Sequence, residues 1–268
     1  MKNIFCVLVI LCSCFVFGQK LETSKKELNA NSGNNSQTTT SESGKNNTDQ
    51  PDNPLLGFLF DITFGLMKLG FVGDYRTENH LDNNVTPYPF YNSKSGNFEP
   101  QDSVFKTSFR IDLEDHFIYN HSDLYGNHLK AKIRPFQYFY FQTDYRQLYE
   151  FRLDHTTDNL SLLHFNFVYD RIRFEKFNFG WTLGASYVGN NVKKAGFNYG
   201  LTADYFMTNN FSFSAAAKWS QINSQPVNAF EFQAKRHVKN YFFALGFQRL
   251  KIASPTYNFV TLGGGIYF

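Results

Sequence analysis

The sequence has very little cysteine, and none of its apolar runs is long enough to cross a membrane as a helix. Its three cysteines, Cys6, Cys12 and Cys14, all lie near the amino-terminus. If that segment is removed, the mature chain has no thiol, which excludes a disulfide framework and a cysteine-based metal or catalytic site. The net charge of +3 is too small to indicate a nucleic-acid partner.

Residues 1–18 are typical of a secretory signal peptide. Lys2 precedes an apolar run from Ile4 to Phe17, which is too short to span a bilayer. Val16 and Gly18 fit the −3 and −1 positions of a cleavage site, so we expect cleavage before Gln19. The mature protein is therefore expected to be exported.

A lipoprotein signal is the alternative interpretation of the same segment. Leu11-Cys12-Ser13-Cys14 resembles a lipobox, in which Cys14 would be lipidated and would begin the mature chain. Cys12 fits that motif poorly, and the residues after Cys14 are apolar where a lipoprotein usually turns polar. Ordinary cleavage is the preferred prediction, and the intact mass of the mature protein distinguishes the two.

Residues 19–103 divide into stretches of different composition. Residues 19–53 are rich in Asn, Ser, Thr and Gly and contain no apolar run, so we expect a disordered periplasmic tail. Residues 54–70 are apolar and are bounded by Asn53-Pro54 and Gly70, which favours a short apolar helix or plug-like segment. The prolines and polar residues that follow predict an irregular connection, so that residues 54–103 precede the main domain.

Aromatic residues are abundant, since 32 Phe and 16 Tyr contribute to an aromatic content of 19%. Aromatic residues favour strands and concentrate on the lipid-facing and interfacial surfaces of membrane barrels. The mean hydropathy of −0.39 is compatible with such a barrel, because strands with one polar face average to neutral values.

From Val104 onward, apolar and polar residues alternate along successive segments that are separated by turn residues. Ten such segments are long enough to cross a membrane at a tilt. A soluble β-sandwich also alternates, but Val, Ile and Leu would fill its apolar face, whereas Phe, Tyr and Trp dominate here. The prediction is an all-β fold, a transmembrane antiparallel up-and-down β-barrel over residues 104–268.

The last strand carries the most specific signal. Val260, Leu262, Ile266 and the terminal Phe268 share one face of it. A carboxy-terminal strand that is apolar on one side and ends in Phe closely resembles the closing strand of Gram-negative outer-membrane β-barrels. In that family the strand is the signal read by the barrel-assembly machinery. The resemblance implies a location in the outer membrane, with its lipid and the assembly machinery as partners, and it indicates no specific subfamily.

Whether the number of strands is even or odd decides whether residues 54–70 can contain a barrel strand. In outer-membrane barrels the carboxy-terminus lies in the periplasm, so an even number of strands places the start of the first strand there as well. Ten strands from Val104 satisfy this condition, whereas counting residues 56–66 as one more would give eleven. A twelve-strand barrel is the alternative and needs a second strand hidden in residues 71–102.

The polar faces of the strands predict the lining of the barrel interior. A barrel of about eight strands is just filled by side chains, and wide channels need about sixteen. Ten strands therefore leave a narrow path at most, which disfavours a general diffusion porin. The interior charges have both signs and are expected to pair across the lumen; they are Lys106, Arg110, Asp112, Lys130, Lys132, Arg134, Asp144, Arg146, Glu150, Asp170 and Asp204.

No convincing catalytic constellation is present in the sequence. Barrel lipases pair a His with a Ser on adjacent strands, and omptin-type proteases use Asp pairs with an Asp-x-His element. The sequence contains no Asp-x-Asp or Asp-x-His element, and its candidates are His116, His121, His155 and His164. We interpret these as solvated loop residues or hydrogen-bonded lumen residues, and we predict no catalytic residue, cofactor or metal.

The leading functional prediction is a non-enzymatic outer-membrane barrel with a structural or narrow-channel, porin-like role. The alternative is an accessory barrel subunit of a larger outer-membrane secretion or assembly complex, which would bring other outer-membrane or periplasmic proteins as partners. Residues 54–70 and the tail motivate that alternative. A lipid- or peptide-cleaving barrel enzyme comes third, and no nucleic-acid partner is expected.

Overall fold

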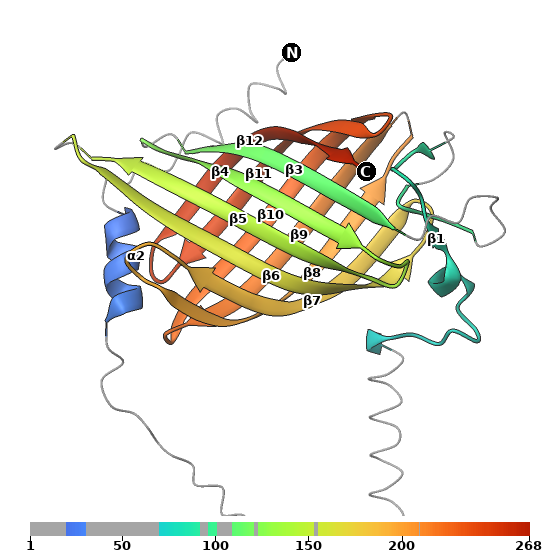
Figure 1. The fold of residues 1–268 in the computed structure, drawn as a ribbon, viewed down its shortest axis with the longest axis horizontal. Coiled ribbons are helices and arrows are strands. Elements are labelled where there is room, and N and C mark those ends of the chain that lie inside the picture. The colour runs from blue at the N-terminus through green and yellow to red at the C-terminus, as the bar shows by residue number, and fades with distance from the viewer. Residues whose placement is uncertain are drawn as a thin grey trace, which may run out of the picture.

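The computed structural model describes residues 20–30, 70–91, 96–100, 109–120, 123–152, 155–208 and 210–268. Ten strands in these ranges form one closed antiparallel barrel, in which β12 closes against β3 (Figure 1). The ten-strand prediction is confirmed, because β1 and β2 pair only with each other, outside the barrel sheet. The barrel strands are β3 (Arg110–Asn120), β4 (Leu124–Arg134), β5 (Phe139–Phe151), β6 (Thr157–Arg173), β7 (Phe177–Val188), β8 (Lys194–Phe206), β9 (Phe211–Ile222), β10 (Gln225–Val238), β11 (Tyr241–Ile252) and β12 (Thr256–Tyr267).

Side chains alternate between the interior and the exterior of the barrel, as the period of two in the sequence predicts. In β3, residues of even number are buried from Arg110 to Asn120, while Phe117 is 53% exposed on the outside. In β12, Val260 and Leu262 face outward, whereas Tyr267 is buried within the barrel. The exterior is therefore apolar and aromatic, and the interior is largely polar.

Two glycines of β12 give space to neighbouring interior side chains. A Cβ atom on Gly263 would lie 2.5 Å from Nδ1 of His116, and one on Gly265 would lie 2.6 Å from the ring of Phe242. Both distances are shorter than real contacts, so any larger residue would force these rings to move. The glycine run in the last strand thus allows a histidine and a phenylalanine to fit inside the barrel wall.

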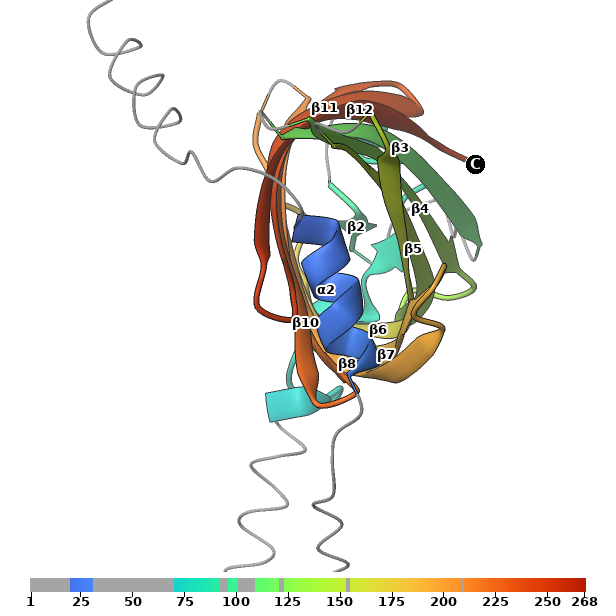
Figure 2. The same cartoon turned by 90° about the vertical axis from the view of Figure 1, so that its left-hand side faces the viewer.

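Helix α2 (Lys20–Asn29) lies across one mouth of the barrel (Figure 2). Residues 19–53 were expected to be disordered, and for residues 20–29 that expectation is wrong. Leu21 and Leu28 are fully buried and join an apolar cluster of barrel side chains. Helical stability usually comes from packing of one face rather than from propensity, and the barrel supplies the surface that the local sequence lacks.

The described residues between Gly70 and Pro100, which are 70–91 and 96–100, form a segment that covers the opposite mouth, where the carboxy-terminus lies (Figure 1). Within it are the short helix η1 (Asn79–Asp82) and the paired strands β1 (Asn84–Val85) and β2 (Phe98–Glu99). We call the two openings of the barrel the α2 mouth and the C-terminal mouth. None of the helices in the described part of the chain has the length and apolar character needed to span a bilayer.

Several predictions fall on residues outside the described ranges. These are the signal peptide of residues 1–18 with Cys14, the remainder of the predicted disordered tail at Gln19 and residues 31–53, the apolar segment up to residue 69, and Lys106. The predicted barrel begins at Val104, and the first described barrel strand begins at Arg110.

Candidate functional site

The interior of the barrel at mid-height contains a layer of buried charged side chains from opposite walls. We call this set the ionic layer: Glu114, Lys130, Asp144, Arg146, Lys218, Glu231 and Lys235, with His128 among them. Each of these residues is 5% exposed or less. Of the predicted lumen charges, Lys132 and Asp204 line a small internal cavity next to this layer. The others in described ranges are buried: Arg110, Asp112, Lys130, Arg134, Asp144, Arg146, Glu150 and Asp170.

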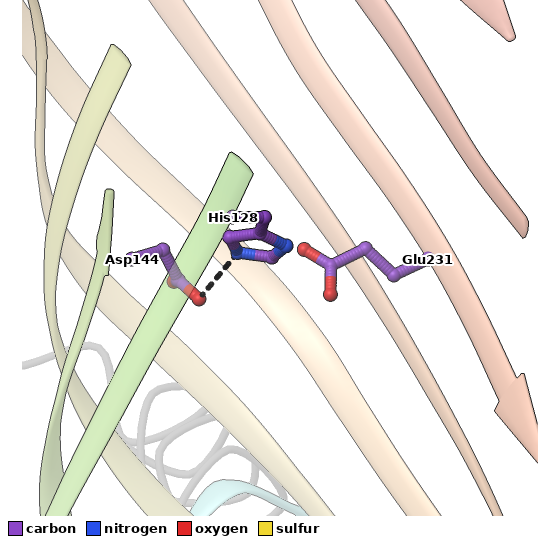
Figure 3. A group of neighbouring side chains, drawn as sticks. All are labelled: His128, Asp144 and Glu231. Atoms are coloured by element: carbon purple, nitrogen blue, oxygen red, sulfur yellow. Dashed lines mark hydrogen bonds and ion pairs between the residues drawn. The ribbon is translucent and has the colours of Figure 1, made fainter. Parts of the chain in front are cut away.

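His128, Asp144 and Glu231 form the centre of the ionic layer (Figure 3). His128 on β4 and Asp144 on β5 come from adjacent strands, and Glu231 on β10 faces them from across the lumen. One nitrogen or oxygen atom from each lies within 4.8 Å of the other two. By geometry alone, this set resembles the ligands of a metal ion.

Three cations already neutralise the two carboxylates. Lys130 Nζ lies 2.8 Å from Glu231 Oε2, and Arg146 Nη2 donates to the other oxygen of Glu231. Lys218 from β9 donates to Asp144. A further cation at this point would meet three positive groups against two negative ones, so the local charge opposes metal binding.

The hydrogen bonds of His128 also leave no lone pair for a metal. Gln248 Nε2 donates to His128 Nδ1 over 2.6 Å, because the Gln248 oxygen faces Arg146 Nε at 3.5 Å. This network assigns the His128 proton to Nε2, which faces Asp144 Oδ1 at 3.4 Å. The residues therefore do not fit a metal centre. They form a cross-linked set of charges that joins opposite barrel walls.

More ion pairs lie on the side of the barrel interior that faces the C-terminal mouth. Lys235 Nζ lies 3.1 Å from both carboxylate oxygens of Glu114. Arg134 donates to Asp170 over 2.7 Å and lies over the ring of Tyr140. The cavity beside these residues has a volume of about 20 Å³, which is room for about one water molecule. Side chains rather than solvent thus fill this part of the lumen.

Short residues line part of the interior wall. They are Gly180, Thr182 and Gly184 on β7, with Gly200 and Thr202 on β8. Thr202 lines the small cavity together with Lys130 and Lys132, so a short side chain lies beside long charged ones at that point.

Two buried Ser–His pairs were not predicted from the sequence. His164 Nδ1 lies 2.6 Å from Ser186 Oγ, and His237 Nε2 lies 2.7 Å from Ser212 Oγ. Both pairs join directly adjacent strands, and strand register was the signal that could have found them. The second nitrogen of each ring has no hydrogen-bond partner among the described residues, so no carboxylate orients either histidine as in a catalytic triad.

The other candidate histidines lie apart from each other. His116 is buried in the lumen, with Nε2 at 3.4 Å from Glu114, and His155 lies in the loop between β5 and β6. His121 lies outside the described ranges. The described histidines therefore do not converge on a single catalytic centre.

The α2 mouth has an apolar interior. The side chains that surround Leu21 and Leu28 are Ile118, Leu124, Leu148, Leu160, Leu162, Val188, Val192, Ile222, Val227, Ala229, Leu250, Ile252, Tyr257 and Phe259. Outside this cluster, Glu22 forms ion pairs with Lys26 at 2.8 Å and with Arg152 at 2.9 Å. The hydrogen bond from Lys26, reinforced by the charge of Arg152, lowers the pKa of Glu22.

At the C-terminal mouth, arginines of the barrel bind backbone oxygens of the covering segment. Arg110 donates to the carbonyl of Thr86 over 3.0 Å and to Asn97 Oδ1 over 2.9 Å. Arg173 donates to the carbonyl of Leu81 and to the hydroxyl of Tyr75. The sequence did not indicate Arg173, because a register shift between Asp170 and Ile172 breaks the alternation at the end of β6.

Residues 70–78 lie on the outer wall of the barrel at this mouth. Trp181 Nε1 on β7 donates to the carbonyl of Phe71 over 2.8 Å. Arg171 forms an ion pair with Glu78 at 2.8 Å, and its hydrogen bond lowers the pKa of that carboxyl. Burial lowers the pKa of His80, which packs against Phe174.

No family model and no curated protein matches the chain. Among solved structures, an outer membrane channel from Pseudomonas putida F1 is 9% identical, with 63% of this chain and 99% of that chain covered, at a TM-score of 0.37. The Yersinia pestis outer membrane protein Ail in a phospholipid bilayer nanodisc is 11% identical, with 60% and 99% covered, at a TM-score of 0.34. The closed barrel of this chain is established by its own strand pairing. Antiparallel strands, an apolar exterior and a polar interior are the architecture of outer-membrane β-barrels.

Proposed function

We propose that this protein is an outer-membrane β-barrel with a structural role, whose lumen is closed to solutes in the state described. The observation that supports this proposal is the ionic layer, in which side chains from opposite walls bind each other directly. Lys130 and Glu231 make such a contact at 2.8 Å across the barrel. A solute that crossed the lumen would have to separate buried ion pairs, which costs several kcal/mol for each unpaired charge.

The exterior supports a location in a membrane. Large apolar side chains are exposed around the wall, among them Phe197 at 62%, Phe243 at 69% and Leu262 at 63%. Soluble monomers rarely expose contiguous apolar patches larger than a few hundred Å². Exposed Phe, Tyr and Leu on alternate positions of all ten strands match the apolar band of an outer-membrane barrel.

The orientation in the membrane is part of the proposal. The resemblance of the last strand to outer-membrane closing strands places the carboxy-terminus in the periplasm. The C-terminal mouth then opens to the periplasm and the α2 mouth to the cell exterior. This orientation would place residues 20–30 outside the cell, whereas residues 19–53 were expected from the sequence to lie in the periplasm. Val260, Leu262, Ile266 and Phe268 stay the predicted signal for barrel assembly.

A liposome-swelling experiment tests the closed lumen. We expect liposomes that contain the folded protein to swell no faster in small sugars than empty liposomes. A general porin of about sixteen strands, reconstituted at the same protein-to-lipid ratio, is the positive control. Swelling at rates comparable with the porin would contradict the proposal and would favour the channel role.

A further inference from the structure

The outer wall formed by β3, β4 and β5, which faces the viewer in Figure 1, carries a polar patch within its apolar surface. We call it the lateral patch: Asp115 on β3, Asn127 on β4 and Gln147 on β5. Asp115 and Asn127 are exposed, Gln147 is half-buried, and all three occupy outward-facing positions of their strands. Asn127 and Gln147 lie directly opposite each other in the register of β4 and β5. The patch is therefore continuous across two neighbouring strands and reaches a third.

The lateral patch lies below a row of tyrosines that marks the edge of the membrane. Tyr119, Tyr125 and Tyr149 are opposite one another on the same three strands. Tyr125 and Tyr149 are two residues closer to the α2 mouth than Asn127 and Gln147, and their rings stack with centroids 5.7 Å apart. Aromatic girdles of outer-membrane barrels lie at the interface between lipid and water. Both amides therefore face lipid on the inner side of that girdle.

Asp115 lies deeper in the same wall. Leu113 and Phe117, the outward-facing residues on either side of it, are 39% and 53% exposed. An ionisable side chain that faces lipid is costly, and such residues mark surfaces that meet a partner. Within the described chain Asp115 Oδ1 accepts one hydrogen bond, from Asn127 Nδ2 over 2.6 Å. The carboxylate thus fixes the orientation of the Asn127 amide.

The hydrogen bonds of the lateral patch leave one acceptor and one donor unused. A carboxylate only accepts, so Asn127 turns its Nδ2 toward Asp115, and its Oδ1 has no donor among the described residues. Gln147 Oε1 accepts from the hydroxyl of Tyr145 over 2.7 Å, and Gln147 Nε2 has no acceptor among the same residues. Hydrocarbon chains satisfy neither group. The unused acceptor and the unused donor are complementary.

A second copy of the chain brings these two groups together. Within one chain Asn127 leans across the wall toward Asp115 on β3, while Gln147 bonds to Tyr145 on its own strand. Copies inserted in the same orientation form a closed pair about a twofold axis parallel to the membrane normal. With that axis between β4 and β5, Asn127 of each copy faces Gln147 of the other, and the contact forms twice.

We infer that the outer wall of β3, β4 and β5 is the interface of a twofold dimer in the membrane, in which Asn127 Oδ1 of each copy accepts a hydrogen bond from Gln147 Nε2 of the other. Asp115 is a positioning residue, because it holds the Asn127 amide with its oxygen free. The partner is a second copy because the groups left unused on this wall complement each other. The inference requires the membrane location and is independent of the closed lumen, so liposome swelling does not bear on it.

Sedimentation equilibrium of the full-length protein in density-matched detergent micelles measures the pairing. We expect a reversible monomer–dimer equilibrium for wild type. Gln147→Leu removes the donor and keeps similar bulk, so the dimer dissociation constant should rise about tenfold. Gln221→Leu, at an exposed position of β9 on the opposite wall, is the matched control and should leave the constant unchanged. Wild type that stays monomeric at every concentration, or equal weakening by both substitutions, would overturn the inference.

Mixing two single variants tests the contact between copies directly. Homodimers of Asn127→Leu or of Gln147→Leu lack both hydrogen bonds, whereas a dimer of one variant with the other keeps one. Native mass spectrometry with one variant isotope-labelled resolves the three dimers. We expect the mixed dimer in clear excess over its random share, and this recovery also shows that both variants fold. A random distribution would contradict pairing of residue 127 with residue 147 across the interface.

The positioning role of Asp115 has a separate readout in the same sedimentation experiment. Asp115→Leu removes the acceptor that holds Asn127 and should weaken the dimer. Asp115→Asn keeps a side-chain oxygen for the same hydrogen bond and should restore pairing close to that of wild type. If Asp115→Asn weakens the dimer as much as Asp115→Leu, the positioning role is wrong.

Discussion

At one mouth of the barrel a regular helix packs two leucines into an apolar interior, whereas at the other an irregular segment is held by arginine side chains. Leu21 and Leu28 are fully buried at the α2 mouth, and the barrel provides partners for both helix ends. At the C-terminal mouth, Arg110 and Arg173 bind carbonyl oxygens of residues 81–86. The first closure depends on apolar burial and the second on charged hydrogen bonds, and the ionic layer separates the two.

This difference has a physical consequence for how each mouth opens. Apolar burial is nondirectional and tolerates small shifts of the helix, so α2 can undock as a unit. Arginine bonds to backbone carbonyls are directional, and each lost bond leaves a buried donor without a partner. The C-terminal mouth should therefore resist opening until several bonds break together.

The largest effect is expected for the ionic layer that separates the mouths. Glu231→Ala leaves Lys130 and Arg146 without their carboxylate partner, and breaking one side of a buried ion pair typically costs about 3–5 kcal/mol. We expect that loss in the free energy of unfolding, measured by urea titration in detergent or lipid vesicles. The outward-facing neighbour Phe230, changed to Leu, is the control. A loss below about 1 kcal/mol would contradict the structural role of the layer.

A smaller and more local effect is expected at the α2 mouth. Leu28→Ala removes a fully buried side chain, and such truncations cost about 2–5 kcal/mol when the cavity does not collapse. Because α2 can undock separately, the loss should appear as faster amide exchange in residues 21–29, with residues 79–86 unchanged. Lys26→Ala, on the exposed side of the same helix, should have little effect. Equal acceleration at both mouths would show that the closures are coupled.

The reverse pattern is expected for Arg173→Lys. Lysine keeps the charge but loses the planar group that reaches Leu81, Tyr75 and Tyr169 at once. The expected cost is about 1.5–3 kcal/mol, the range for a hydrogen bond to a charged group. Faster exchange should be confined to residues 79–86 and leave α2 protected. Faster exchange of α2 in this variant would contradict the separation of the two mouths.

Acidification should distinguish the mouths by the pH at which each loosens. Burial lowers the pKa of His80 below its usual 6.5. The neutral imidazole therefore stabilises the docked covering segment above that pH, and this stabilisation is lost as the pH falls. The pKa of Glu78 is lowered by Arg171, so its contribution is lost below about 4.5. At the α2 mouth the pKa of Glu22 is lowered, mainly by Lys26, and its contribution is also lost only below about 4.5. The C-terminal mouth should therefore begin to loosen about two pH units earlier.

Tryptophan fluorescence measures this difference. Trp181 contacts Phe71 of the covering segment, and Trp219→Phe leaves Trp181 as the only tryptophan. We expect a change in its emission that begins below pH 6.5, while exchange in α2 is unchanged until about pH 4.5. His80→Gln should remove the earlier step. If the change in emission below pH 6.5 persists in His80→Gln, a group other than His80 causes it.

Most of the barrel could be predicted from the sequence, because period-two alternation is a local signal. The outward position of Phe197, Leu201 and Leu262 follows directly from their spacing along the strands, and so does the interior position of Asp144. The number of strands followed from the same alternation, together with the requirement that the first strand starts and the last strand ends on the same side of the membrane. The lumen charges were recognisable as a set because every one of them lies on the polar side of an alternating segment.

The parts that could not be predicted depend on contacts between distant segments. The pairing of Lys130 with Glu231 requires knowledge of which strands face each other across the closed barrel. Arg173 was missed because a bulge breaks the alternation just before it. Helix α2 was missed because its only apolar anchors are Leu21 and Leu28, which a polar composition conceals; their spacing with Ser24 was the available signal.

Single-channel conductance in planar bilayers tests most directly whether the ionic layer closes the barrel independently of both mouths. The proteins to compare are wild type, L28D, which is expected to release α2, and the double variant R110A R173A, which removes both arginines that hold the C-terminal segment. The account predicts no steady conductance for any of the three, since Lys130, Arg146 and Glu231 still cross the lumen. A stable open level in either single-mouth variant would contradict it and would identify that mouth as the gate of a channel.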